Sequence, residues 1–230
     1  MSQRRRRKKP ATCYMCERNY VSKEHVPPKS FFPEKGELDS GLDYRKNLIT
    51  VPSCEFHNLE KSDDDQYLLF VVVSSFRASD VAQKLFSKKI IRAIKRRPSL
   101  GSFYRDNFKV EIGGKETMGY RVDRNRFDDT ISKLVSALYF YTYKEKWVDR
   151  FFVFSPEIYS TNSNAAEVNS TMIDLEKKTG MHMKNQEFLG SNPAVFRYKI
   201  MRRENYVLAR MLFYQGVVIN AFSDNNQFAA

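Results

Sequence analysis

Cysteine is scarce in this chain, and long apolar runs are missing. Its 230 residues include only 3 cysteines, too few for the disulfide framework of a small secreted protein. The longest apolar run is residues 67–73, far short of the roughly 20 residues of a membrane-spanning helix. The basic start is not followed by an apolar stretch, so a secretory signal is not expected. We therefore expect a protein of the reducing cytoplasm, with no membrane among its partners and with cysteines available for a metal.

Acidic residues are also too few to balance the basic ones. The chain has 27 Asp and Glu against 39 Lys and Arg, which gives a net charge of +12. Half of this excess comes from one run at the start, made of Arg4, Arg5, Arg6, Arg7, Lys8 and Lys9. A second basic cluster, in a stretch without acids, contains Lys84, Lys88, Lys89, Arg92, Lys95, Arg96 and Arg97. Such a distribution favours a polyanionic partner, and nucleic acid before membrane.

The remaining composition is that of a folded protein, with 42% hydrophobic and 14% aromatic residues. The length suffices for one sizeable core, or for one small and one larger domain. We expect a disordered basic arm over 1–10, because its like charges repel and bury nothing. A metal-stabilised module over 11–78, a basic amphipathic helix over 79–99 and an α+β domain over 100–230 would follow.

The three cysteines form a metal-binding pattern with one histidine. Cys13-x2-Cys16 is followed about forty residues later by Cys54-x2-His57. Each pair places two ligands on one turn, and the two turns can complete a tetrahedron around Zn²⁺. His25 is an alternative fourth ligand that would leave His57 free, although the spacing from Cys54 favours His57. A zinc knuckle without any catalytic role is the alternative interpretation of these residues, and the surroundings of His25 argue against it.

Further motifs surround the two pairs in a fixed order. They are Glu24-His25-Val26-Pro27-Pro28, then Asn47-Leu48-Ile49, then Asn58 and Lys61 after the second pair. Together with the cysteine pairs they resemble the HNH, or ββα-metal, endonucleases of the zinc-containing kind. The resemblance covers about residues 11–65, under a third of the chain. It implies a small N-terminal ββα module in which a structural Zn²⁺ replaces a core that so short a segment cannot build.

The resemblance also implies a role for each matching residue. His25 would act as general base on the attacking water, which a neutral imidazole can do near physiological pH. Glu24, where the family usually has Asp, and Asn58 would bind a catalytic Mg²⁺ or Mn²⁺. Asn47 would tie down its loop and orient the base. The catalytic set is therefore His25, Asn47 and Asn58, and the expected reaction is hydrolysis of DNA phosphodiester bonds, by nicking if the protein is a monomer.

The biological setting that this resemblance implies is bacterial anti-phage defence or restriction, with a partner protein of such a system. The alternative is a zinc-stabilised nucleic-acid-binding or adaptor module without catalysis. Residues 100–230 carry no functional motif. In a third interpretation, this region binds a partner protein or folds over the site and holds it inactive. The oligomeric state is left open.

Nucleic-acid contacts are expected from basic residues in three places. The residues concerned are Lys61, the arm residues Arg4, Arg5, Arg6 and Arg7, and the helix residues Lys88, Arg92, Lys95 and Arg96. The arm would add salt-sensitive affinity for the phosphate backbone. Solvated surface charge is the plain alternative for each. Asp63, Asp64 and Asp65 form an acidic run, but on a helix they point in different directions, and we expect solvation there.

The expected fold class is α+β: the small ββα module is followed by helices and by a larger α+β region with antiparallel strands. Periodicity and punctuation predict the following elements. Strands are expected near 19–24 and over 48–51, 150–154, 196–201, 206–213 and 217–222, with a hairpin of 108–112 and 118–122 around a Gly-Gly turn. Helices are expected from 53 through the Asp run to about 76, over 81–96 and 124–143, and over 165–178 with a stop at Gly180.

Overall fold

The computed structural model describes residues 12–38, 41–59, 62–75, 77–112 and 114–224. The fold is α+β with antiparallel strand pairing throughout these ranges, as predicted. The basic arm over 1–10, with Arg4 to Arg7, lies outside the described residues, and so does Lys61. No helix in the described ranges combines the length and the apolar character needed to span a bilayer.

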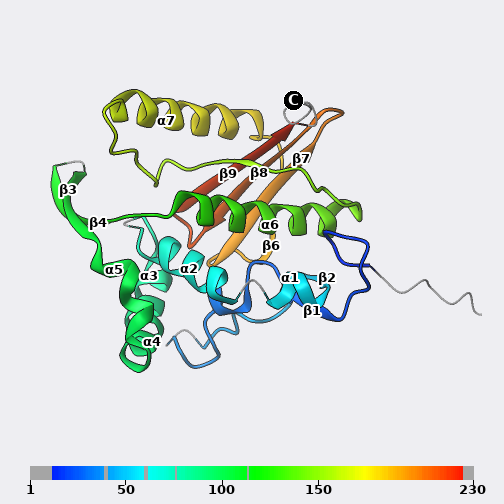
Figure 1. The fold of residues 1–230 in the computed structure, drawn as a ribbon, viewed down its shortest axis with the longest axis horizontal. Helices are drawn as coiled ribbons and strands as arrows, with labels where there is room; N and C mark the ends of the chain where they lie inside the picture. Colours follow the sequence, from blue (N-terminus) through cyan, green and yellow to red (C-terminus); the bar gives the residue numbers. More distant parts are fainter. Residues whose placement is uncertain (1–11, 39–40, 60–61, 76, 113, 225–230) are drawn as a thin grey trace, which may run out of the picture.

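The C-terminal part of the chain, called the rear part below, builds a five-stranded antiparallel sheet in the order β5-β9-β8-β7-β6. Strands β6 to β9 are labelled in Figure 1. Its strands are β5 (Phe152–Phe154), β6 (Leu189–Asn192), β7 (Phe196–Arg202), β8 (Tyr206–Phe213) and β9 (Val217–Asp224). The three long strands were predicted because their residues alternate. On β8 this alternation buries Val207, Ala209, Met211 and Phe213 completely on one face.

Two long helices cover the two faces of this sheet. On the face of Met211, α6 (Arg124–Tyr143) packs against Tyr198, whose hydroxyl lies 3.2 Å from Thr142 Oγ1. The opposite face carries Arg210, which contacts Glu176 of α7 (Ala165–His182). The bounds predicted for α6 are confirmed at both ends. Asp123 caps the helix by accepting a hydrogen bond from the Arg126 backbone N–H, and the apolar residues keep helical spacing.

Near the N-terminus a two-stranded antiparallel hairpin leads into a helix. The hairpin pairs β1 (Ser22–His25) with β2 (Thr50–Ser53), and α1 (Glu55–Leu59) and α2 (Ser62–Val73) follow. The strands lie one to three residues later than predicted. The 3₁₀ turn η1 (Lys29–Phe31) lies in the long connection between them.

Between these two parts lie a basic helical segment and a second hairpin. The segment consists of α3 (Asp80–Leu85), a π-helical turn η2 (Phe86–Ile90) and α4 (Ile91–Arg96), followed by the short helices η3 (Pro98–Gly101) and α5 (Ser102–Arg105). The predicted helix over 81–96 is confirmed, with Ile90 buried, although its middle turn is widened. The predicted hairpin is also present, as β3 (Asn107–Ile112) and β4 (Lys115–Tyr120).

Two predictions about the rear were wrong or incomplete. Helix α7 does not stop at Gly180 but continues to His182. A helical Gly costs only about 1 kcal/mol relative to Ala, and here Thr179 and Met183 on either side of it are buried. Strand β6 was missed, because the sequence Leu-Gly-Ser-Asn does not alternate and its pairing with β7 is irregular.

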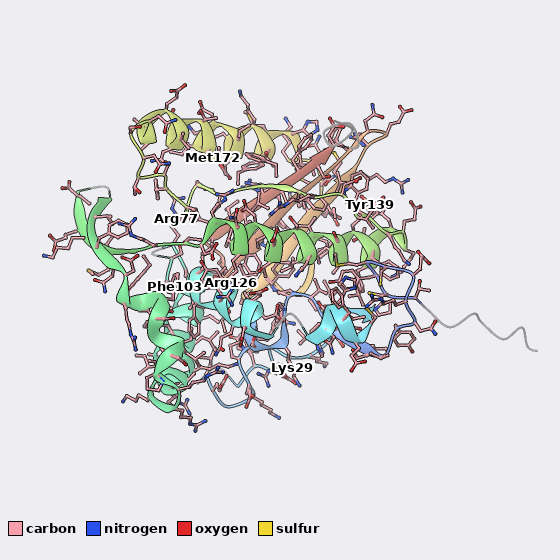
Figure 2. The ribbon with its side chains drawn as sticks, in the orientation of Figure 1. Lys29, Arg77, Phe103, Arg126, Tyr139 and Met172 are labelled. Atoms are coloured by element: carbon pink, nitrogen blue, oxygen red, sulfur yellow. The ribbon has the colours of Figure 1, made fainter. Side chains whose placement is uncertain are left out.

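One apolar core joins the N-terminal hairpin region to the rear sheet. The Phe31 ring lies 5.7 Å from the Phe213 ring, and the buried Tyr214 hydroxyl donates a hydrogen bond to the Phe31 carbonyl at 2.8 Å. Helix α6 also reaches α2 through Arg126, which is labelled in Figure 2. Arg126 pairs with Asp64 at 2.6 Å and lies 4.4 Å from the centre of the Tyr67 ring. The N-terminal region therefore rests on the rear of the molecule.

Candidate metal centre

Three cysteines and one histidine converge at the N-terminal hairpin. The sulfurs of Cys13 and Cys54 each lie 3.3 Å from His57 Nδ1, and the sulfur of Cys16 lies 3.7 Å from it. Cys16 and Cys54 are 3.8 Å apart, and all four ligand atoms lie within 4.8 Å of one another. With Zn–S near 2.3 Å and Zn–N near 2.0 Å, tetrahedral ligand atoms would stand roughly 3.5–3.8 Å apart. The quartet therefore suits a metal ion such as zinc.

The local backbone explains why these four residues meet. A turn that follows Cys13 is closed by the hydrogen bond from its N–H to the Arg18 carbonyl, which sets Cys16 beside it. Cys54 directly follows β2, and His57 comes one turn later on α1. The Tyr14 N–H donates to the Pro52 carbonyl at 2.8 Å, which fixes the two halves together.

Of the two histidines considered as fourth ligand, His57 joins the sulfurs and His25 does not. His25 ends β1, where it pairs with Thr50 across the hairpin. Partial burial lowers its pKa, and the positive charges of Lys29 and Arg45 lower it further, against an opposing effect of Glu24. The imidazole is therefore held toward its neutral form at neutral pH.

A small cavity lies beside His25. Its lining includes Glu24, the prolines that follow His25, Asp65 of α2, and Thr130 and Leu134 of α6. The sequence did not predict that Asp65, Thr130 and Leu134 would lie beside His25, because no local pattern marks a helix residue that will face a distant strand. The expectation of a solvated acidic run holds for Asp63, which is exposed. Asp64, which pairs with Arg126, and Asp65, which lines this cavity, are only partly exposed.

Glu24 is directed toward the interior. One of its carboxylate oxygens is buried. Burial, followed by the negative charge of Glu24, raises the pKa of the fully buried Tyr14 well above its usual range. The partly buried Glu24 thus acts electrostatically on Tyr14, and it lines the small cavity together with Asp65.

The two asparagines of the motif lie on the surface. Asn58 is exposed on α1. Asn47 has a left-handed backbone, with φ of 55°, and its carbonyl accepts a hydrogen bond from Ser191 of β6 at 3.0 Å. The neighbouring Lys46 carbonyl accepts another from Asn192. Within the described ranges, no second group of three or more His, Cys, Asp or Glu side chains converges as the quartet does.

The basic segment α3-η2-α4 is fastened beside the connection that follows His25. Lys89 donates a hydrogen bond from Nζ to the Ser30 carbonyl at 3.0 Å, and its partial burial lowers its pKa. Lys88 is half-buried, whereas the outward side chains are exposed: Lys84, Arg92, Lys95 and Arg96. The role of Lys89 as an anchor was not predicted, because its partner lies 59 residues away in sequence.

Comparison with known proteins adds no relative. A scan against protein-family models, a search of curated proteins and a search of solved structures each found no match.

Proposed function

We propose that this protein is a metal-dependent DNA endonuclease of the HNH type. The observation that carries the proposal is the order and placement of its parts. A Cys₃His quartet suited to zinc lies at an antiparallel hairpin whose first strand ends in His25, and the helix after the second strand carries Asn58. The residues that match the resemblance thus occur on a strand end, a loop and a helix that belong to one hairpin region.

The proton-accepting step is assigned to His25. A base must be neutral before it can take a proton from water, and both burial and the charges of Lys29 and Arg45 lower the pKa of this imidazole. Asn47, held by the contact of its carbonyl with Ser191, would keep the adjoining loop in place.

Two metals have separate roles in this proposal. Zn²⁺, held by the quartet, would stabilise the hairpin and take no part in hydrolysis. Glu24 and Asn58 offer the oxygen ligands that Mg²⁺ or Mn²⁺ prefers. Such an ion, when bound, supplies charge stabilisation for the phosphate that is cleaved.

The substrate class follows from the charge distribution. The net charge is +12, and exposed cations line the helix beside the His25 connection. Neutralising several phosphates with Lys and Arg gives sequence-independent affinity that falls as salt rises. Lys61 and the arm Arg4 to Arg7 would add to this affinity, and a single site of this type would cut one strand.

The test is incubation of the full chain with supercoiled plasmid and Mg²⁺ or Mn²⁺. We expect open-circle product, and its loss on His25→Ala with zinc content unchanged. The matched control is His182→Ala, because His182 is exposed and its Nε2 lies 3.2 Å from the hydroxyl of Tyr206 on β8. Cutting that persists in His25→Ala at the wild-type rate would refute the assignment.

A binding module without catalysis is the second candidate, and one observation favours it. One carboxylate oxygen of Glu24 is buried, and its charge acts on the buried Tyr14, so this carboxylate can serve the interior of the module instead of a catalytic metal. This candidate predicts salt-dependent DNA binding with intact zinc and no cleavage in either divalent ion.

A further inference from the structure

An open hollow of about 420 Å³ lies against the metal quartet, apart from the cavity at His25. It is lined by Arg18, Asn19, Val21, Cys54, Glu55 and Phe56. Its residues come from the turn after the first cysteine pair and from the start of α1, so the metal-stabilised fold itself shapes the hollow. An open hollow of this kind leaves its lining accessible to one group of a larger molecule.

The lining combines an exposed aromatic face with a cation. Phe56 is 48% exposed and Val21 is 64% exposed, so both side chains offer apolar surface to a ligand. The Arg18 guanidinium lies 5.0 Å from the centre of the Phe56 ring. Flat aromatic and guanidinium surfaces are those on which unpaired nucleobases stack. Asn19 and Glu55 add an amide and a carboxylate at the rim, groups that can hydrogen-bond a base edge.

The hollow is also aligned with the proposed catalytic residue. Successive residues of a strand point to opposite faces, and Ser22 and Glu24 of β1 each have a buried side-chain oxygen. Lys23 and His25 therefore share the other side of β1, and Val21 directly precedes this strand. Four residues of strand span roughly 13 Å, a distance covered by a short run of nucleotides. Lys23, which is exposed, lies between the two ends and can meet a phosphate.

We propose that this hollow binds an unpaired nucleobase of the nucleic-acid strand that His25 acts on. The base would stack on the Phe56–Arg18 pair while its backbone follows β1 past Lys23. The inference rests on the proposed function for the identity of the strand, but it concerns binding and can be tested without cleavage.

The test compares two single-stranded probes of equal length and charge, one with normal bases and one wholly abasic. Fluorescence anisotropy with the full chain carrying His25→Ala gives the affinity for each without cutting. We expect the base-bearing probe to bind more tightly, and Phe56→Ala to reduce this preference by roughly 5-fold to 100-fold while leaving the abasic affinity unchanged. Phe56→Tyr should retain the preference, because it retains the ring.

Matched variants separate stacking from damage to the fold. Tyr159→Ala removes an aromatic side chain of similar exposure (42%) from outside the hollow and should change nothing. Zinc content is measured for every variant, because Phe56 also touches the His57 ring, 5.2 Å away. If Phe56→Ala loses zinc, Arg18→Ala decides the matter. This substitution keeps the Arg18 carbonyl that accepts a hydrogen bond from the Cys13 N–H, and it too should lower the base preference.

Three results would overturn the inference. They are an unchanged base preference in Phe56→Ala, an equal loss of affinity for both probes, and displacement of the strand by a free deoxynucleoside monophosphate as effectively as by the base-bearing probe. The plasmid assay separates this from the proposed function. A wild type that shows the Phe56-dependent preference but never cuts loses only the nuclease assignment, whereas one that cuts with no such preference loses only the hollow.

Discussion

The N-terminal hairpin region and the rear sheet are stabilised in different ways. The hairpin of β1 and β2 has four residues in each strand, and three cysteines and a histidine meet at its end. The three long strands of the rear sheet have seven or eight residues, and the inner face is completely buried at Tyr198, Met211 and Phe213. A short segment with few apolar residues needs a metal or a neighbour, whereas long alternating strands can build a core.

The same difference separates what can be inferred about function. Metal ligands and a candidate base must have particular chemistry at particular spacing, so the hairpin region carries a motif. The strands of the rear sheet show mainly the alternation of buried and less buried residues that packing requires, and many different sequences can supply that alternation. The contacts between them, such as Tyr214 with Phe31, make the rear a support for the candidate site.

Removal of the metal should have the largest effect and would show whether the two regions unfold together. Structural zinc contributes on the order of 10 kcal/mol to the folding of small zinc modules. We expect chelation, or Cys54→Ser, to unfold the hairpin region while the rear sheet persists. Amide hydrogen exchange would measure this region by region. The fluorescence of Trp147, which packs against Tyr139 and Phe151, would report on the rear. A cooperative loss of both signals would mean one folding unit instead of two.

The second largest loss of stability is expected from truncation of Phe213, because this side chain joins the two regions. Its ring contacts Phe31 at 5.7 Å and Phe196 at 4.8 Å and is completely buried. Phe213→Ala should lower the free energy of unfolding by about 3–5 kcal/mol, measured by urea denaturation. Phe152→Ala is the control, since Phe152 is about half exposed and should cost much less. Equal losses for both would argue against a shared core at this point.

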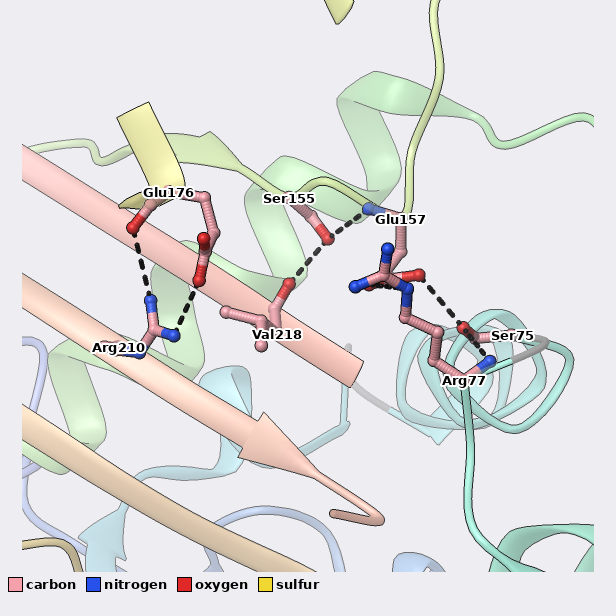
Figure 3. Close-up of polar contacts among 7 residues, drawn as sticks. All are labelled: Ser75, Arg77, Ser155, Glu157, Glu176, Arg210 and Val218. Atoms are coloured by element: carbon pink, nitrogen blue, oxygen red, sulfur yellow. Dashed lines mark hydrogen bonds and ion pairs between the residues drawn. The ribbon is translucent and has the colours of Figure 1, made fainter. Parts of the chain in front are cut away.

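The ion pair that fastens α7 to the sheet should have a smaller effect, confined to the rear. Arg210 Nη2 lies 2.6 Å from Glu176 Oε1, and both side chains are about four-fifths buried (Figure 3). Losing one partner leaves the other charge poorly compensated, so Arg210→Met should cost about 1–2 kcal/mol. The double variant with Glu176→Gln should recover part of this loss. Zinc content should stay the same; a fall would reveal coupling to the front of the molecule.

The smallest expected effect concerns the acidic side of the pH profile for plasmid cleavage. The pKa of His25 is lowered, so its neutral form persists to lower pH than in an ordinary histidine, and activity should too. Lys29→Met removes one of the charges that lower this pKa. The pKa should rise, and the pH at which the rate falls should move upward. Lys109→Met, on the β3 hairpin, should leave the profile in place. A pH profile that does not change in Lys29→Met would mean that the proton transfer limiting the rate does not involve His25.

Several features of this protein were determined by the sequence alone. The α+β class, both ends of α6, the three long strands and the metal quartet all follow from local spacing, caps and ligand chemistry. Each of these features depends on residues a few positions apart, or on residue types such as the three cysteines, whose spacing is typical of metal ligands.

Other features depended on tertiary structure. It decided that α7 continues through Gly180, that β6 joins the sheet edge, and that Asp65, Thr130 and Leu134 line the cavity at His25. It also assembled the hollow of Arg18 and Phe56. These outcomes arise from contacts between segments far apart in the chain. Their free energy comes from packing, which no local pattern of residues specifies.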